Sequence, residues 1–174
     1  MYYIRVSGVN PVGTGTPSNV ISLTPSTTPG VSVIVSSASC DNQQVLVTWV
    51  PPVNTGGAPI LSYNLQYSTS STGPWLPSPT PYSVAAPTIS YTFTGLTNGT
   101  PYYFQVAPVN INGPGPYSAQ TANSTATPSI TPQPPIPIPV TTSAITSSSI
   151  ALSWTAPTGL ANTGGNPITG YLIY

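Results

Sequence analysis

The sequence offers almost no side chains that could perform acid–base or nucleophilic chemistry. Its 174 residues contain one basic residue, Arg5, one acidic residue, Asp41, and no histidine. General acid–base catalysis needs a group that titrates near neutral pH, and a serine nucleophile needs such a base beside it. A zinc site needs about four Cys, His or carboxylate ligands, and the sequence supplies only Cys40 and Asp41. We therefore expect no enzyme activity, no metal ion and no cofactor.

The scarcity of charge also limits the partners that we expect. Charged residues make up 1% of the chain, against about 25% in an average soluble domain. A chain without net charge does not attract nucleic acid or anionic lipid, and no apolar run approaches the roughly 18 residues of a membrane span. We therefore expect no nucleic-acid partner and no membrane insertion in this segment. Such a surface needs glycans to stay dispersed, or it packs against neighbouring chains.

The chain repeats itself with a period of roughly one hundred residues. The segment MYYIRVSGVNPVGTGTPS at residues 1–18 returns as PYYFQVAPVNINGPGPYS at residues 101–118. Residues 45–67 return at residues 150–174, with a tryptophan, an Asn-Thr-Gly-Gly run and a tyrosine in common. A period this long indicates a string of globular domains, because solenoid repeats run about 20–50 residues.

We expect this repeat to divide the chain into one complete domain, two partial domains and two linkers. The complete domain spans residues 31–127, and residues 1–24 form the last two strands of a preceding domain. Residues 140–174 form the first three strands of a following domain. Residues 25–30 are a short linker, and the proline-rich residues 128–139 predict an extended polyproline spacer. At about 3.1 Å per residue, that spacer would reach about 37 Å.

Alternating apolar and polar residues predict about seven short strands in the complete domain. Prolines between residues 73 and 87 leave room only for a short edge strand. The other strands are expected at residues 31–37, 44–50, 60–68, 88–95 and 102–110, with a last one within residues 117–127. Short strands separated by turn residues, without helical periodicity, indicate an antiparallel β-sandwich. The expected core consists of Trp49, Tyr63, Leu65, Phe93, Tyr102, Phe104 and Val106.

These features together resemble the fibronectin type III domain. Trp49 lies in the second expected strand before a proline-rich loop, and Trp154 repeats this arrangement. Leu96 stands six residues before Tyr102, which is similar to the tyrosine corner of that family. The resemblance implies an all-β fold of tandem fibronectin-type-III-like, immunoglobulin-like antiparallel β-sandwiches, one complete and two partial. Some members bind integrins through Arg-Gly-Asp, but the single arginine here is followed by valine, so that role is not implied.

Several polar residues are candidates for glycosylation. The sequons at Asn98 and Asn123 fit N-glycosylation, although Asn98 with the next glycine also suits a tight turn. Asn123 falls in the expected last strand, where an outward side chain could carry a glycan. Threonine beside proline resembles the composition of O-glycosylated stalks, although these residues equally suit turns and linkers. The candidates for O-glycosylation are Thr24, Thr27, Thr28, Thr127 and Thr131.

Cys40 is the only cysteine, so no disulfide can form within this chain. It falls between the first two expected strands of the complete domain. One interpretation is a solitary, partly exposed thiol without a role. The other is an intermolecular disulfide, to another chain or to a part of the protein outside this sequence.

The sequence thus predicts a structural segment of a long extracellular tandem-repeat protein that forms a surface fibre, sheath or stalk and carries glycans. Its partners would be copies of itself or neighbouring repeats. The alternatives are a spacer or accessory carbohydrate-binding module of a secreted polysaccharide-degrading enzyme, and the stalk of a cell-surface adhesin. The partial repeats fit either a window on a longer covalent chain, which we favour, or strand exchange between short subunits. In the first case Met1 is an internal residue or an arbitrary start.

Overall fold

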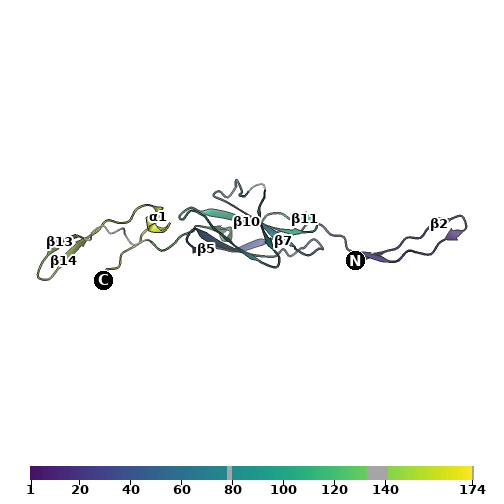
Figure 1. The fold of residues 1–174 in the computed structure, drawn as a ribbon, viewed down its shortest axis with the longest axis horizontal. Coiled ribbons are helices and arrows are strands. Elements are labelled where there is room, and N and C mark those ends of the chain that lie inside the picture. The colour runs from purple at the N-terminus through teal and green to yellow at the C-terminus, as the bar shows by residue number, and fades with distance from the viewer. Residues whose placement is uncertain (78–79, 133–140, 174) are drawn as a thin grey trace.

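The computed structural model describes residues 1–77, 80–132 and 141–173. The molecule is elongated, with three parts in a row (Figure 1). A two-sheet sandwich, which we call the central domain (residues 31–127), lies in the middle. The N-terminal hairpin, residues 1–24, extends from one of its ends, and residues 141–173 lie at the other end.

The central domain is built from two antiparallel sheets. The first sheet has the strand order β5-β6-β9, with bounds Val33–Asp41, Gln44–Val50 and Ser90–Phe93. The second has the order β11-β10-β7-β8, with bounds Gly113–Pro114, Tyr102–Asn110, Ser62–Ser68 and Tyr82–Ala85. A fifth strand, β12 (Thr125–Ala126), pairs with β10. The predicted all-β antiparallel sandwich is confirmed, and β8 is the short edge strand expected among the prolines.

The core lies between the two sheets, where alternate residues of each strand point inward. Every residue that the sequence predicted for the core is buried. Trp49 from β6 and Tyr63 from β7 pack edge to face across the sandwich, with ring centroids 5.3 Å apart. Burying one large apolar side chain of this kind stabilises the fold by about 1.5–3 kcal/mol.

The expected tyrosine corner is present at the start of β10. The hydroxyl of Tyr102 accepts a hydrogen bond from the backbone N–H of Thr97 at 3.0 Å. Leu96 beside it is buried in the core. This bond ties the loop before β10 to the strand, so Tyr102 has a structural role.

The first hairpin of the central domain is longer than the sequence predicted. Strand β5 runs to Asp41 instead of ending at residue 37, and it turns directly into β6 through Asn42 and Gln43. Gln43 takes the positive φ of 58° that this turn requires. Cys40 therefore lies within the last residues of a strand, and the prediction of a loop position for it is wrong.

The last strand, predicted within residues 117–127, is present but covers only two of these residues. Only β12 is a strand there, and Ala122–Ser124 form a short 3-10 helix, η1. Along this edge of β10, side chains form hydrogen bonds with backbone groups that a neighbouring strand would otherwise pair. Ser118 Oγ accepts from the N–H of Val106 at 3.2 Å, and Gln120 Nε2 donates to the carbonyl of Phe104 at 3.1 Å.

The N-terminal hairpin has four short strands, β1 (Tyr2–Ile4), β2 (Val9–Asn10), β3 (Gly13–Thr14) and β4 (Ile21–Leu23). Its register across the tip pairs Asn10 with Gly13, as Asn110 pairs with Gly113 in the central domain. Three further bonds match at the same offset. The backbone N–H of Val6 donates to Ser18 Oγ, that of Ser18 donates to the carbonyl of Val6, and that of Gly15 donates to the carbonyl of Gly8. Each of these bonds is repeated one hundred residues later.

Residues 141–173 form a two-stranded hairpin and a single helical turn. The strands are β13 (Thr141–Ile145) and β14 (Ile150–Ser153), and the turn is α1 (Leu160–Thr163). The third strand that the sequence predicted here is wrong, because the described residues 164–173 contain no strand. Its counterpart in the central domain, β7, pairs with β10 and β8, and residues 141–173 include no equivalent of these two neighbours.

Candidate functional site

Neither charged side chain belongs to a catalytic or metal-binding arrangement among the described residues. Arg5 is exposed on the N-terminal hairpin, and Asp41 is exposed at the end of β5. Asp41 Oδ1 accepts the N–H of Asn42 at 2.6 Å. Across the described ranges, no three His, Cys, Asp or Glu residues gather where they could hold a metal ion. The same ranges contain no helix with the length and apolar character needed to cross a membrane.

The central domain holds a group of tyrosines in its core. Burial raises the pKa of Tyr63, Tyr67 and Tyr91 above the ordinary value of 10.0, and neighbouring tyrosine hydroxyls add to the effect at the last two. Burial also raises the pKa of Tyr117. These phenols remain protonated at neutral pH. The rings of Tyr67 and Tyr91 pack edge to face on Phe93, and that of Tyr63 packs edge to face on Trp49. Their environment is that of a structural core.

Asn98 lies in the turn before β10 and its amide is already engaged. Its Nδ2 donates to Asn42 Oδ1 at 2.8 Å, and its Oδ1 accepts from the N–H of Gln43 at 3.0 Å. The side chain is half-buried. An N-linked glycan would attach at Nδ2, the atom that makes the first of these bonds. N-glycosylation at Asn98 stays a prediction, and its folded-state geometry favours the turn interpretation.

Asn123 is exposed in the middle of η1. The flanking residues hold this turn: the N–H of Thr121 donates to Ser124 Oγ at 2.8 Å, and Thr125 Oγ1 donates to the carbonyl of Tyr102 at 3.1 Å. Of the two sequon asparagines, Asn123 is therefore the one with an accessible side chain. The expectation that it stands in a strand is wrong, because Asn123 lies in η1, just before β12, but its exposed position agrees with the requirement for a glycan.

The remaining candidates for modification are exposed as well. Cys40 is a free, exposed thiol. Each threonine proposed for O-glycosylation is also exposed, namely Thr24, Thr27, Thr28, Thr127 and Thr131. Their side chains are accessible to modifying enzymes. The structure does not bring these residues together into one site.

The short linker, residues 25–30, is packed on the central domain. Thr27 donates its backbone N–H to the carbonyl of Gly56 at 2.8 Å, and Gly30 donates to the carbonyl of Asn54 at 2.8 Å. Asn110 Nδ2 donates to the carbonyls of Thr27 at 2.7 Å and Thr55 at 2.9 Å. The Asn-Thr-Gly-Gly loop and β10 therefore hold the linker from two sides. We call this arrangement the entry clamp.

Gly56 is required at the centre of the entry clamp. Its φ of 74° is rarely adopted by residues with a side chain, and a Cβ there would lie 2.2 Å from the carbonyl oxygen of Thr27. Asn54 Oδ1 fixes the loop by accepting the N–H of Gly56 at 2.8 Å. The sequence marks this loop only as a repeated Asn-Thr-Gly-Gly run. The repetition of the two glycines was the available signal for a tight contact.

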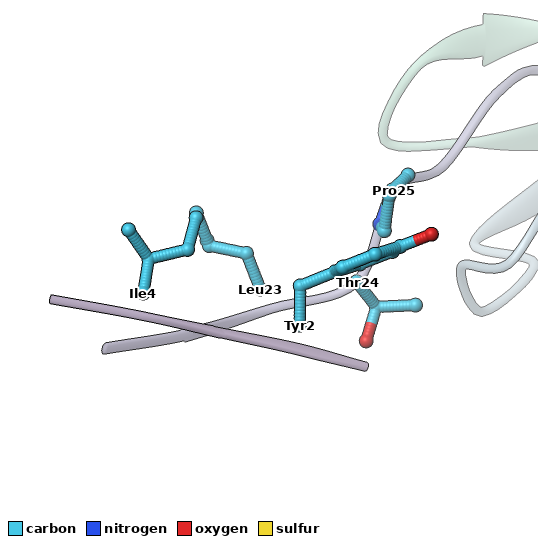
Figure 2. A pocket seen from close by; sticks show the side chains of 5 residues that line it. All are labelled: Tyr2, Ile4, Leu23, Thr24 and Pro25. Carbon is cyan, nitrogen blue, oxygen red and sulfur yellow. The ribbon is translucent and has the colours of Figure 1, made fainter. Parts of the chain in front are cut away.

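An open apolar hollow lies where the N-terminal hairpin meets the linker (Figure 2). It has a volume of about 500 Å³ and is lined by Tyr2, Ile4, Leu23, Thr24 and Pro25. Ile4 and Leu23 come from paired strands and stand on the same side of the hairpin. Among the described residues, the lining carries no charged group, so the hollow is an uncovered patch of core-type side chains.

The two packed sheets, the buried tryptophan and the tyrosine corner together define an immunoglobulin-like sandwich domain. The chain belongs to the fibronectin type III family, because the sequence pattern of the fibronectin type III domain matches residues 28–124. Domains of this family are generally non-catalytic, in agreement with the composition.

The chain is similar to segments of larger proteins. It is 30% identical to Myomesin-2 of Homo sapiens over 99% of this chain and 12% of that protein. It is 29% identical to Exoglucanase B of Cellulomonas fimi over 87% of this chain and 13% of that protein. The crystal structure of the FN5 domain of Drosophila Lar is 26% identical, covers 57% of this chain and 96% of that domain, and has a TM-score of 0.43. The chain thus spans about an eighth of the two larger proteins.

Proposed function

We propose that this chain is a structural segment of a long extracellular protein made of tandem fibronectin type III domains, forming a surface fibre, sheath or stalk. The observation that carries this proposal is the N-terminal hairpin. It has the turn register and backbone bonds of residues 102–118 in the central domain, yet its apolar face is exposed. A hairpin with this sequence is the end of a second domain, whose other strands would cover that face.

The other end of the chain supports the same proposal. Trp154 and Tyr171 pack edge to face with ring centroids 5.3 Å apart, as Trp49 and Tyr63 do in the central domain. In residues 141–173, however, both rings are exposed. These residues therefore begin a third domain of the same kind, and the chain is a window on a covalent string of repeats.

Glycans account for the solubility of such an uncharged string. The chain has 1% charged residues, and its edge strand β8 has no lysine or glutamate to oppose pairing with another chain. Asn123 and the candidate threonines are exposed where sugars could attach. The partners in the fibre would be copies of this chain or neighbouring repeats, packed along uncharged faces.

Denaturing, reducing electrophoresis of protein from its natural source tests this proposal. We expect a species many times larger than the 17.8 kDa of this chain, with mobility that increases after enzymatic removal of glycans. Reduction removes any contribution from an intermolecular disulfide at Cys40. A band near 18 kDa would overturn the tandem string. A large species of bare polypeptide mass would keep the string and overturn the glycans.

A second candidate function is supported by the similarity to Exoglucanase B. In that case the chain would be a spacer or accessory carbohydrate-binding module of a secreted polysaccharide-degrading enzyme. Sugar rings pack on exposed aromatic faces, and within the described part of the central domain Tyr82 is the one aromatic side chain among the exposed large hydrophobic residues. A binding assay on insoluble cellulose separates the candidates: the structural proposal predicts no retention, and specific retention would favour the accessory module.

A further inference from the structure

The Asn-Thr-Gly-Gly run occurs twice, and the structure gives both copies the same contact. In the second copy, the backbone N–H of Ile130 donates to the carbonyl of Gly164 at 2.9 Å, as that of Thr27 donates to Gly56. Gly164 has a φ of 69°, and a Cβ there would lie 2.2 Å from the carbonyl oxygen of Ile130. The second loop therefore clamps the chain that leads into residues 141–173 in the way that the first clamps residues 25–30.

The second loop also touches the domain before it. Gly165 packs so closely on the Asn98–Gly99 turn of the central domain that a Cβ would lie 2.6 Å from the N–H nitrogen of Gly99 and 3.1 Å from Asn98 Cβ. Gly99 donates its own N–H to the carbonyl of Pro128 at 2.9 Å. The Asn98–Gly99 turn, the outgoing chain and the incoming loop thus form one contact between two consecutive repeats.

A further pair of bonds holds the outgoing chain on the central domain. Ser39 Oγ accepts the N–H of Ser129 at 2.9 Å and lies 3.1 Å from the carbonyl oxygen of Ser129, to which it donates. Pro128 is buried beside them. The chain leaving the central domain is therefore fixed through residue 130, up to the point where the second loop meets it.

We propose that the Asn-Thr-Gly-Gly loop is an interdomain lock, which binds both the incoming chain of its own repeat and the Asn-Gly turn of the preceding repeat. The partner is an intrachain neighbour, recognised through backbone carbonyls and N–H groups that only a side-chain-free loop can approach. This lock fixes the angle between neighbouring repeats through residues 128–130, the first part of the proline-rich linker; the rest of the predicted polyproline spacer, from residue 133 on, lies outside the described residues. It rests on the proposed function only where it extends to repeats outside this chain.

The lock also has a consequence for glycosylation at Asn98. A glycan on Asn98 would occupy the space in which Gly165 packs, so glycosylation there and a closed lock exclude each other. Occupancy at Asn98 would accordingly mark junctions that are open, whereas Asn123 lies outside the contact and is neutral.

Amide hydrogen exchange followed by NMR on the 174-residue chain tests the lock. We expect the N–H groups of Thr27 and Ile130 to exchange on the order of tenfold more slowly than unstructured amides. Gly164→Ala should abolish the protection of Ile130 while leaving Thr27 unchanged, and Gly56→Ala should do the reverse. Gly159→Ala and Gly95→Ala are matched controls, because both glycines have positive φ with nothing within 4 Å of the position of a Cβ.

The amide of Val106 in β10 reports whether a variant still folds. If Gly56→Ala unfolds the central domain, Gly164→Ala still decides the second junction. Fast exchange of Ile130 in the unmodified chain, or equal losses in Gly164→Ala and Gly159→Ala, would overturn the lock. Neither result bears on the size of the native protein, so a failure here is distinct from a failure of the proposed function.

Discussion

The N-terminal hairpin and its copy in the central domain have related sequences and opposite environments. Along one face of β1 and the residues after it, Tyr2, Ile4 and Val6 are 64%, 44% and 70% exposed. Along the same face of β10, one hundred residues later, Tyr102, Phe104 and Val106 are 7%, 0% and 0% exposed. The turn register and the hydrogen bonds nearest the turn are the same in both, whereas the open ends differ, because Tyr2 pairs with Leu23 and Tyr102 pairs with Ala126. The local bonds of this hairpin therefore form without a core, and burial is supplied by strands that are distant in sequence.

A second comparison shows that not every strand forms without the rest of its domain. Residues 164–173 correspond in sequence to residues 56–65, which include the first residues of β7, but they form no strand in the structure. A hairpin satisfies its backbone groups within itself, whereas a single strand needs neighbours on its edges. The partial repeats thus keep their hairpins, whose bonds are local in sequence, and lose the strand that pairs only with strands distant in sequence.

The largest expected effect comes from removing a large side chain at matched positions. Phe104→Ala empties part of the core and should lower the free energy of unfolding of the central domain by about 3–5 kcal/mol. Ile4→Ala, at the equivalent exposed position, should change it by less than about 0.5 kcal/mol. Urea unfolding followed by tryptophan fluorescence measures both. A large cost for Ile4→Ala would mean that the hairpin packs against the central domain.

The next effect concerns the serine that bonds to the strand edge. Ser118→Ala leaves the buried N–H of Val106 without its acceptor and should cost about 1–3 kcal/mol. Ser18→Ala removes the same bond to Val6 in an exposed hairpin, where water replaces the acceptor, and should be within about 0.5 kcal/mol of neutral. The same urea titrations decide this, and equal costs for the two serines would contradict the comparison.

The tyrosine corner should show a smaller difference. Tyr102→Phe deletes the hydroxyl that accepts the N–H of Thr97 and should destabilise the central domain by about 1 kcal/mol. Tyr2→Phe changes an exposed ring and should leave the unfolding midpoint where it was. Thermal unfolding followed by circular dichroism distinguishes the two variants. An unchanged midpoint for Tyr102→Phe would show that the tyrosine-corner bond does not stabilise the central domain.

The smallest effect is expected for pH in the neutral range. The buried Tyr63 and the partly buried Tyr67 and Tyr91 have raised pKa values, so the unfolded chain loses protons more readily than the folded one above pH 10. Stability should therefore be full below about pH 10 and fall as the pH rises beyond it. Unfolding midpoints from pH 5 to 11 test this, and a loss of stability between pH 5 and 9 would contradict it.

Much of the fold was predictable because alternation and turn residues report local structure. Three features were not. β5 continues through a serine-rich stretch into a turn without glycine, so no pattern marked its end at Asp41. The last strand is shortened to β12, and η1 precedes it, because Ser118 and Gln120 bond to β10 through their side chains, which strand patterns do not reveal. The third strand of residues 141–173 fails for want of partner strands.

The junctions were the least predictable part. The loop at Gly56 contacts a linker about 30 residues earlier in the sequence, and no local pattern reports a contact between backbones so far apart. Two consecutive glycines in both copies were the sole hint. The modification candidates came from short sequons and composition, and the structure adds how exposed each of them is.

The central claim is that the N-terminal hairpin is the same structural element as its copy in the central domain. The most direct test joins residues 31–100 to residues 1–24, so that the N-terminal hairpin replaces that copy. If the two hairpins are the same element, the hybrid folds as a domain. We expect one cooperative unfolding transition, at lower stability than that of residues 31–127, with the amide of Val6 as protected from exchange as that of Val106. A hybrid without a cooperative transition, under conditions where residues 31–127 unfold cooperatively, would contradict the claim.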